Sequence, residues 1–314
     1  MLARLTSLTV RVTALAGGVG GAKLVVGLQR VVGEHTTAIV NTGDDSVIYG
    51  VHVCPDVDIV TYWCAGIADT QRGWGLAGDT FHFVEALRAL GRDAWFSLGD
   101  RDLATCTYRT QRLAEGAGLA LVTDEIRRAL GVAAGILPMS EQPVATRITT
   151  TDGDDLAFQE YFVKQRCEPE VAEIRSEGIE SAAPAPGVLA AIEAADVVLI
   201  CPSNPLLSIA PILGLDGVRD ALRAHRQVIA VSPIVQGKAL KGPADRLLNR
   251  LGHGSSASGV ARLYADVCDV FVVDERDPDE AGKVAELEIE PLLADTIMSD
   301  GAASERLAKV VLGV

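Results

Sequence analysis

Short apolar runs rich in β-branched residues alternate along the chain with stretches of helical periodicity, and no other feature constrains the fold as strongly. Strands joined by crossover helices form parallel sheets with helices on both faces. Strands are expected at residues 9–15, 36–40, 94–98, 133–137, 196–201, 227–231 and 269–274. Helices are expected at residues 22–32, 80–90, 124–130, 187–194, 217–224, 243–251 and 258–265. The sequence therefore predicts an α/β fold with a Rossmann-like, doubly wound and mainly parallel sheet.

One segment departs from this alternation. The stretch ATRITTTDGDDLAFQEYFV, which starts at Ala145, predicts a β-hairpin through Asp152 and Gly153, followed by charged sequence. We expect residues 145–183 to form a small inserted or edge α+β subdomain. Because the chain contains no repeats, long linkers or low-complexity stretches, we expect residues 1–314 to form a single Rossmann-like domain around this insertion.

The turn after the first expected strand, GGVGGAK, places four glycines at Gly17, Gly18, Gly20 and Gly21 and ends in Lys23. Glycine permits positive φ and close approach of the backbone, and free N–H groups at a helix start favour anions. The turn lacks the Gly-Lys-Ser/Thr of a Walker A loop, and Lys23 stands where a dinucleotide fingerprint needs its third glycine. A tight packing turn is one reading, but the position after the first strand favours phosphate binding, with Lys23 as a nearby cation.

Acidic residues gather after the second expected strand. The segment NTGDD places Asp44 and Asp45 there, and CPDVD adds Asp56 and Asp58. One or two such carboxylates can hold Mg²⁺, with water and a substrate phosphate completing its shell. Turn and capping chemistry would also use these residue types. Since adjacent side chains point in different directions, we expect only one of Asp44 and Asp45 to be a ligand.

Polar residues follow most of the other strands, and in open α/β sheets ligands bind beyond the carboxyl ends of the strands. Arg101 follows the run at 94–98 and could clamp phosphate oxygens, whereas Asp102 is expected to cap the helix that follows. Ser203, Asn204 and Ser232 follow two later strands, where their side chains could bind the polar edge of a base. This edge of the sheet is therefore the predicted active-site face.

The net charge of −14 argues against a nucleic-acid partner, because phosphate backbones bind basic surfaces. A phosphate ester would then need local neutralisation, which Mg²⁺ supplies. No apolar run reaches the ~20 residues that span a bilayer, so no membrane partner is expected. Arg11 and several threonines interrupt the apolar start of the chain, which favours a cytoplasmic protein with residues 1–8 as a loose leader over a signal peptide.

Nine ordered motifs resemble the 2-phospho-L-lactate transferase family of coenzyme F420 biosynthesis. They are GGVGGAKLVVGL, VNTGDD, CPDVDIVTYW, GWGLAGDTF, LGDRDLAT, ILPMS, PSNPLLSI with PIL shortly after it, VSPIVQGKALKGPA and VFVVDERD. The resemblance implies a Rossmann-like, Mg²⁺-dependent, homodimeric transferase. It implies transfer of a phosphorylated three-carbon acid from guanosine diphospho-lactate, or its enolpyruvyl counterpart, to the deazaflavin alcohol Fo, with release of GMP.

The same resemblance implies roles for individual residues. The turn at 17–23 would hold the donor phosphates, and Asp44 or Asp45 would act with Asp58 to bind Mg²⁺ or to orient the ribityl hydroxyl of Fo. Asp45, Asp58 and Arg101 are the catalytic candidates, and Asp58 also matches an aspartate that contacts Fo. Guanosine would lie near the serines and the asparagine that follow the later strands: Ser203, Asn204 and Ser232. Ser97 stands where some members carry a lysine that contacts Fo.

Two other functions remain open from the sequence. A related regulatory family that binds a UDP-sugar shares the glycine-rich turn and the Asp-Asp pair, but it would show a Gly-Ser-Ser run where Ser46-Val47-Ile48 stands here. A nucleotide-dependent oxidoreductase would need the dinucleotide fingerprint that the turn at 17–23 lacks.

Overall fold

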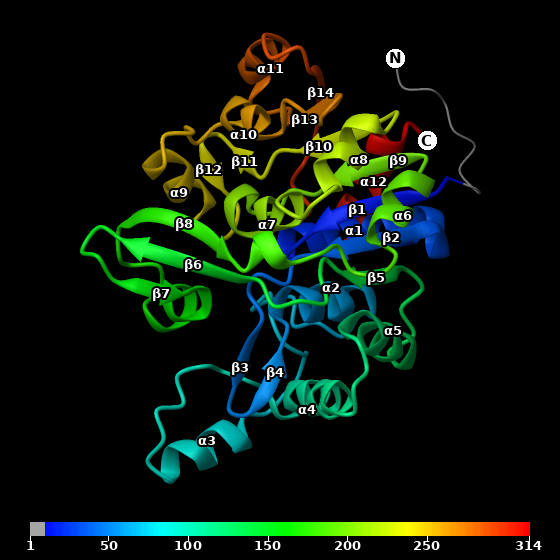
Figure 1. Cartoon of the computed structure of the whole chain (residues 1–314). Coiled ribbons are helices and arrows are strands. Elements are labelled where there is room, and N and C mark those ends of the chain that lie inside the picture. The colour runs from blue at the N-terminus through cyan, green and yellow to red at the C-terminus, as the bar shows by residue number, and fades with distance from the viewer. Residues whose placement is uncertain (1–9) are drawn as a thin grey trace.

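Seven parallel strands form the central sheet of the computed structural model, which describes residues 10–314 (Figure 1). From one edge to the other the strands are β14 (Glu290–Ala294), β13 (Val270–Asp274), β10 (Val228–Val231), β9 (Val197–Ile200), β1 (Val12–Ala16), β2 (Thr36–Val40) and β5 (Gly135–Pro138). All six neighbouring pairs run parallel. The predicted α/β fold with a doubly wound parallel sheet is confirmed. The expected leader at residues 1–8 and the first residue of the expected strand 9–15 lie outside the described residues.

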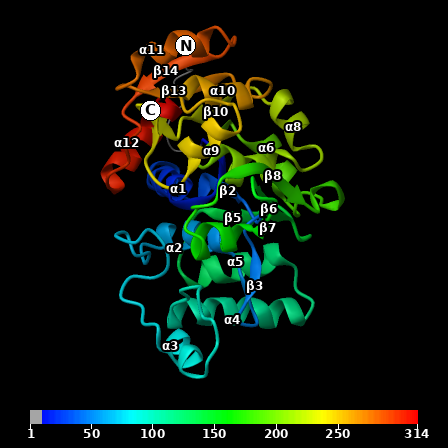
Figure 2. The same ribbon diagram turned by 90° about the vertical axis from the view of Figure 1, so that its left-hand side faces the viewer.

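Helices cover both faces of this sheet, and alternate residues of each strand supply the two cores. Ala14 and Ala16 of β1 face the core under α1 (Gly18–Val32), α2 (Pro55–Cys64) and α12 (Gly301–Leu312). Leu15 faces the core under α6 (Val188–Ala194), α8 (Val218–Ala224), α10 (Ala257–Tyr264) and α11 (Pro278–Ala285). Figure 2 shows α12 and α8 on opposite sides of the molecule. Burial on both faces explains why these strands read as continuous apolar runs.

A lower lobe lies between β2 and β5 in sequence (Figure 1). It contains the hairpin β3 (Ser46–Ile48) and β4 (Val51–Val53) and the helices α3 (His82–Ala89), α4 (Asp100–Ala114) and α5 (Leu119–Ala129). The strand expected at 94–98 is wrong: among residues 10–314 this segment has no strand partner, and its buried Ala94 and Leu98 pack with Val84 and Cys106. The Tyr49 hydroxyl donates to the carbonyl of Phe96 and accepts from its amide, which replaces two sheet hydrogen bonds.

Capping in this lobe also differs from expectation. Helix α4 begins at Asp100, so Asp102 lies in its first turn and does not cap it. The Asp79 carboxylate accepts instead from the amides of Arg101 and Asp102, at 2.9 and 3.1 Å. The Asp100 carboxylate in turn accepts from the amides of His82 and Phe83 at the start of α3. These contacts cap α4 with Asp79 and α3 with Asp100, and the Asp102 side chain takes no part in capping.

A second antiparallel sheet, β7 (Asp155–Ala157), β6 (Ala145–Thr150) and β8 (Val171–Glu177), lies within the expected insertion at 145–183. The β6–β7 turn passes through Gly153, which has the positive φ that the Asp-Gly pair predicts. A π-helical turn, η2 (Glu160–Lys164), follows β7 and packs against the main body through Tyr161. Further along the chain, a short hairpin β11 (Ile234–Val235) and β12 (Lys238–Ala239) leads into α9 (Ala244–Arg250). In residues 10–314, none of the helices is long and apolar enough to cross a bilayer.

Candidate active site

A cavity of about 770 Å³ opens at the carboxyl edge of the central sheet; we call it the main cavity. Its wall combines the turn after β1, the first turn of α2, the loops after β9 and β14, and the segments 72–75 and 239–244. Ten of the predicted site residues line it: Gly17, Gly18, Gly20, Lys23, Asp44, Asp58, Ser97, Ser203, Asn204 and Ser232. Gly21, Asp45 and Arg101 do not. The structure therefore brings together residues that lie up to 215 positions apart, from Gly17 to Ser232.

The turn at 17–23 needs several of its glycines because other chain segments pack closely against its backbone. Helix α1 begins at Gly18, whose φ of 60° is left-handed. A Cβ at Gly20 would overlap the carbonyl oxygen of Pro202, and one at Gly21 would lie 2.6 Å from Ser203 Oγ. The Gly18 amide donates to Asp56 Oδ1 at 2.7 Å, so a buried carboxylate already stands at this helix N-terminus. The turn thus fixes Asp56 beside the cavity as well as exposing backbone to it.

Lys23 does not point freely into the main cavity. Its Nζ donates to the carbonyl oxygen of Met298 at 2.7 Å and lies 5.7 Å from the centre of the Trp63 ring. Burial, followed by the charge of Lys241, lowers the pKa of Lys23. This lysine therefore ties α1 to the 296–299 segment and places its ammonium group at the cavity wall.

Asp44 and Asp56 form a buried acidic pair that lines the main cavity. Asp56 accepts from Asn41 Nδ2 at 3.0 Å and from the Gly18 amide, whereas Asp44 Oδ1 has no hydrogen-bond partner among residues 10–314. Burial raises the pKa of Asp44 well above its usual range, and the charges of Asp56 and Asp45 raise it further. Burial also raises the pKa of Asp56 to about 6. A bound cation would relieve both effects, so this pair and its orphaned oxygen fit Mg²⁺.

Asp45, unlike its neighbour Asp44, does not line the main cavity. Its Oδ2 lies 3.4 Å from His52 Nε2, and Cys54 is close enough for the three side chains to share one small cluster. Burial raises the pKa of Asp45. Asp45 therefore lies behind the cavity wall, where it contacts His52. Of the neighbours Asp44 and Asp45, Asp44 is the one that lines the cavity.

Asp58 forms a buried ion pair that the sequence analysis missed. Arg109 of α4 is fully buried; its Nη1 donates to Asp58 Oδ2 at 3.1 Å, and its Nη2 donates to Asp58 Oδ1. Nη1 also donates to the carbonyl of His52. The spacing of Asp102, Cys106 and Arg109 along one face of α4 was the available signal, since residues three, four and seven apart share a helix face. This pair fixes the Asp58 carboxylate at the wall.

Within residues 10–314, Asp102 is the cavity-lining carboxylate that forms no ion pair and does not belong to the Asp44–Asp56 pair, although the charge of the nearby Arg109 acts on it. Its Oδ1 accepts from the Tyr62 hydroxyl at 2.8 Å. Burial, followed by the charge of Asp58, raises the pKa of Asp102 to about 7. Arg101, its neighbour, is exposed and donates from Nη1 to the Ala77 carbonyl at 3.3 Å, outside the cavity. Of the two, only Asp102 lines the main cavity.

The serine and asparagine side chains predicted near a base also hold the loops that carry them. Ser203 Oγ exchanges hydrogen bonds with the amide and carbonyl of Gly17. Asn204 Oδ1 accepts from two amides at the start of the turn that follows it. Ser232 Oγ bonds both backbone groups of Ile234. These residues therefore position wall segments, and part of their hydrogen-bonding capacity is already used.

Aromatic side chains form a further part of the cavity wall. Phe158 stacks on Phe162 with ring centres 5.2 Å apart, and Phe96 lies beside Ser97. Trp74 is 40% exposed, and the Arg72 guanidinium lies 4.9 Å from its ring centre. The wall is suited to a planar ring.

The family model for 2-phospho-L-lactate transferase CofD matches residues 12–309. The chain belongs to this family. A 2-phospho-L-lactate transferase from Methanothermobacter thermautotrophicus is 42% identical over 96% of this chain and 97% of its own length. A phosphoenolpyruvate transferase from Thermobifida fusca is 41% identical over 90% and 92%. A crystal structure of a UPF0052 family member from Bacillus halodurans shares the fold, with a TM-score of 0.64 at 16% identity over 96% of this chain and 98% of that one. The resemblance drawn from the sequence motifs is confirmed.

Proposed function

We propose that this CofD family member transfers a phosphorylated three-carbon acid from a guanosine diphospho-acid donor to the primary alcohol of the deazaflavin Fo, releasing GMP, in coenzyme F420 biosynthesis. The observation that carries the proposal is one cavity in which a glycine-rich strand–helix turn meets a buried carboxylate pair and an aromatic wall. Family membership over nearly the whole chain supports the same reaction.

Mg²⁺ is the proposed metal, and Asp44 and Asp56 are the residues that would hold it. Both are buried beside the turn, and Asp44 Oδ1 has no hydrogen-bond partner in the described part of the chain. Asp58 was also a predicted ligand, but both of its oxygens accept from Arg109, which offsets its charge and favours an orienting role. When bound, Mg²⁺ would neutralise phosphate oxygens and favour the departure of GMP.

The protein groups around the alcohol supply position and a proton acceptor. The ribityl oxygen forms a bond to the phosphorus that carries the acid, the bond from that phosphorus to the GMP oxygen breaks, and Asp102 takes the hydroxyl proton. The Tyr62 hydrogen bond holds Asp102 in place at the wall. Phosphoryl-type transfer needs little covalent work from the enzyme, so fixing the alcohol, the donor and this carboxylate supplies most of the rate enhancement.

The aromatic wall is the proposed site of the deazaflavin ring. Phe96 of the lower lobe and Phe158 of the expected insertion line the main cavity, and the partly exposed Trp74 also lines it. A planar ring stacked there would bury apolar surface. The ribityl chain would then extend from this wall towards Asp58 and Asp102. We also propose a homodimer, on the family resemblance alone, and light scattering of the purified chain would test it.

The test is turnover with defined donors. Relatives of both names match at almost equal identity, so purified protein is incubated with Fo, Mg²⁺ and either guanosine diphospho-lactate or its enolpyruvyl counterpart. Mass spectrometry should detect GMP and Fo enlarged by the phosphorylated acid with at least one donor. No GMP from either donor would exclude the proposed reaction.

A further inference from the structure

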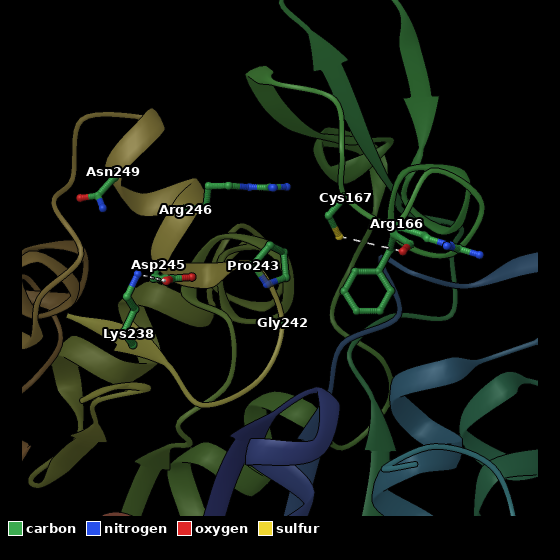
Figure 3. Close-up of a pocket in the computed structure, with 9 residues that line it drawn as sticks. Arg166, Cys167, Lys238, Gly242, Pro243, Asp245, Arg246 and Asn249 are labelled. Atoms are coloured by element: carbon green, nitrogen blue, oxygen red, sulfur yellow. Dashed lines mark hydrogen bonds and ion pairs between the residues drawn. The ribbon is translucent and has the colours of Figure 1, made fainter. Parts of the chain in front are cut away.

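A second depression, the side groove, adjoins the main cavity and has a volume of about 680 Å³ (Figure 3). It lies between η2 and the start of α9. Phe162, Gly242 and Pro243 line both hollows, so the two are direct neighbours. Phe162 stacks on Phe158, and this aromatic pair forms the boundary between them.

The side groove is cationic in a protein of net charge −14. Arg246 of α9 extends across the opening towards Cys167 (Figure 3). Its Nη2 donates to a neutral partner, the Tyr161 hydroxyl, at 3.2 Å. Arg166 stands on the opposite rim with its guanidinium turned outward, and among residues 10–314 it makes no hydrogen bond or ion pair. Within the described part of the chain, neither of these two guanidinium groups forms an ion pair with a carboxylate.

The remaining charges of the groove cancel. Lys238 Nζ lies 3.7 Å from Asp245 Oδ2, and the two side chains occupy the same wall. The Tyr161 hydroxyl fixes the Arg246 side chain, and buried Ala244 and Leu247 anchor the helix that carries it. Arg246 is therefore a held cation with unused N–H donors, and such a group binds carboxylate or phosphate oxygens.

We infer that the side groove is an anion subsite, in which Arg246, assisted by Arg166, binds a carboxylate or phosphate group of a ligand that extends out of the main cavity. The inference rests on the proposed function for the identity of that ligand. Two sources carry the chemistry: the carboxylate of the three-carbon acid, and the 5′-phosphate of the GMP that leaves. Their common path into the groove runs over Phe162 and past Pro243.

The test measures direct binding, so it does not depend on turnover. Calorimetry on the full chain gives the dissociation constants of 2-phospholactate and of GMP for wild type, Arg246→Gln and Arg166→Gln. The matched control is Arg250→Gln, which removes a positive charge from the end of the same helix, outside the groove, where Arg250 faces Glu170 and the Val171 carbonyl. Circular dichroism confirms that each variant is folded.

We expect Arg246→Gln to weaken one ligand by about 5- to 10-fold, the range of a partly exposed charge-assisted contact, and Arg166→Gln to weaken the same ligand less. Loss confined to 2-phospholactate assigns the groove to the acid, and loss confined to GMP assigns it to the nucleotide phosphate. If the Arg246→Gln and Arg250→Gln variants have the same dissociation constants for both ligands, the subsite is refuted. Absence of turnover in wild type would refute the proposed function and leave this binding result to stand separately.

Discussion

Arg109→Gln should destabilise the protein more than any other single charge removal in α4. In wild type the guanidinium binds both oxygens of Asp58 and the carbonyl of His52, and Arg109 is fully buried. The variant leaves the Asp58 charge buried without its partner. Breaking a buried ion pair from one side costs about 3–5 kcal/mol, against a total stability of about 5–15 kcal/mol for an ordinary domain.

Urea unfolding at pH 7, followed by circular dichroism, measures this loss as a lower midpoint. The double variant Arg109→Gln/Asp58→Asn removes both charges and should recover part of it, because no unpaired ion then remains in the wall. Arg112→Gln is the matched control on the same helix; its guanidinium pairs with the partly exposed Glu125, and a much smaller change is expected. An Arg109→Gln midpoint equal to that of wild type, or a double variant less stable than the single one, would refute the reasoning.

Three further predictions concern the main cavity. Asp44→Asn and Asp56→Asn should each weaken Mg²⁺ binding at least about tenfold by calorimetry, whereas Ser97→Ala should not; unchanged affinity would place the metal elsewhere. Asp102→Asn should lower kcat by about 10²- to 10⁴-fold while the Kd of Fo stays near that of wild type. The wild-type rate should also fall below pH 7, because Asp102 then gains its proton. A wild-type rate that stays constant down to pH 5 would exclude Asp102 as the proton acceptor. Because burial raises the folded-state pKa of Asp56 to about 6, metal-free protein should gain stability from this group as pH falls from 7 towards 4. Thermal unfolding of the Asp56→Asn variant should show a smaller gain over the same pH range. If wild type and Asp56→Asn show the same pH dependence of stability, the burial argument is contradicted.

The fold was predictable because its strongest signals are local. The strand expected at 36–40 coincides with β2, and the expected helix at 187–194 agrees with α6 to one residue. Both follow from periodicity within a few residues. The strand prediction at 94–98 was wrong because an apolar segment can be buried without a sheet partner. Here the Tyr49 hydroxyl forms hydrogen bonds with both backbone groups of Phe96. Helix α2 was missed because its acidic first turn reads as a loop of metal ligands.

The candidate site was predictable in position and less so in detail. The edge of the sheet and most wall residues follow from what stands after each strand. The pairing of Arg109 with Asp58 joins residues 51 positions apart, and no local pattern specifies which partner a buried arginine takes. The sequence also could not distinguish the role of Asp44 from that of Asp45, or show that the Met298 carbonyl holds Lys23. Each depends on how a turn, after β2 or after β1, packs against distant segments of the chain.

The stoichiometry of a single reaction tests the central claim most directly. Protein, Mg²⁺ and guanosine diphospho-lactate or its enolpyruvyl counterpart are mixed with and without Fo, and GMP and enlarged Fo are quantified together by mass spectrometry. The account predicts one GMP for each Fo converted, and almost none when Fo is omitted. GMP formed at the same rate without Fo would show that water is the acceptor, and the account of a deazaflavin alcohol held beside Asp58 and Asp102 would be contradicted.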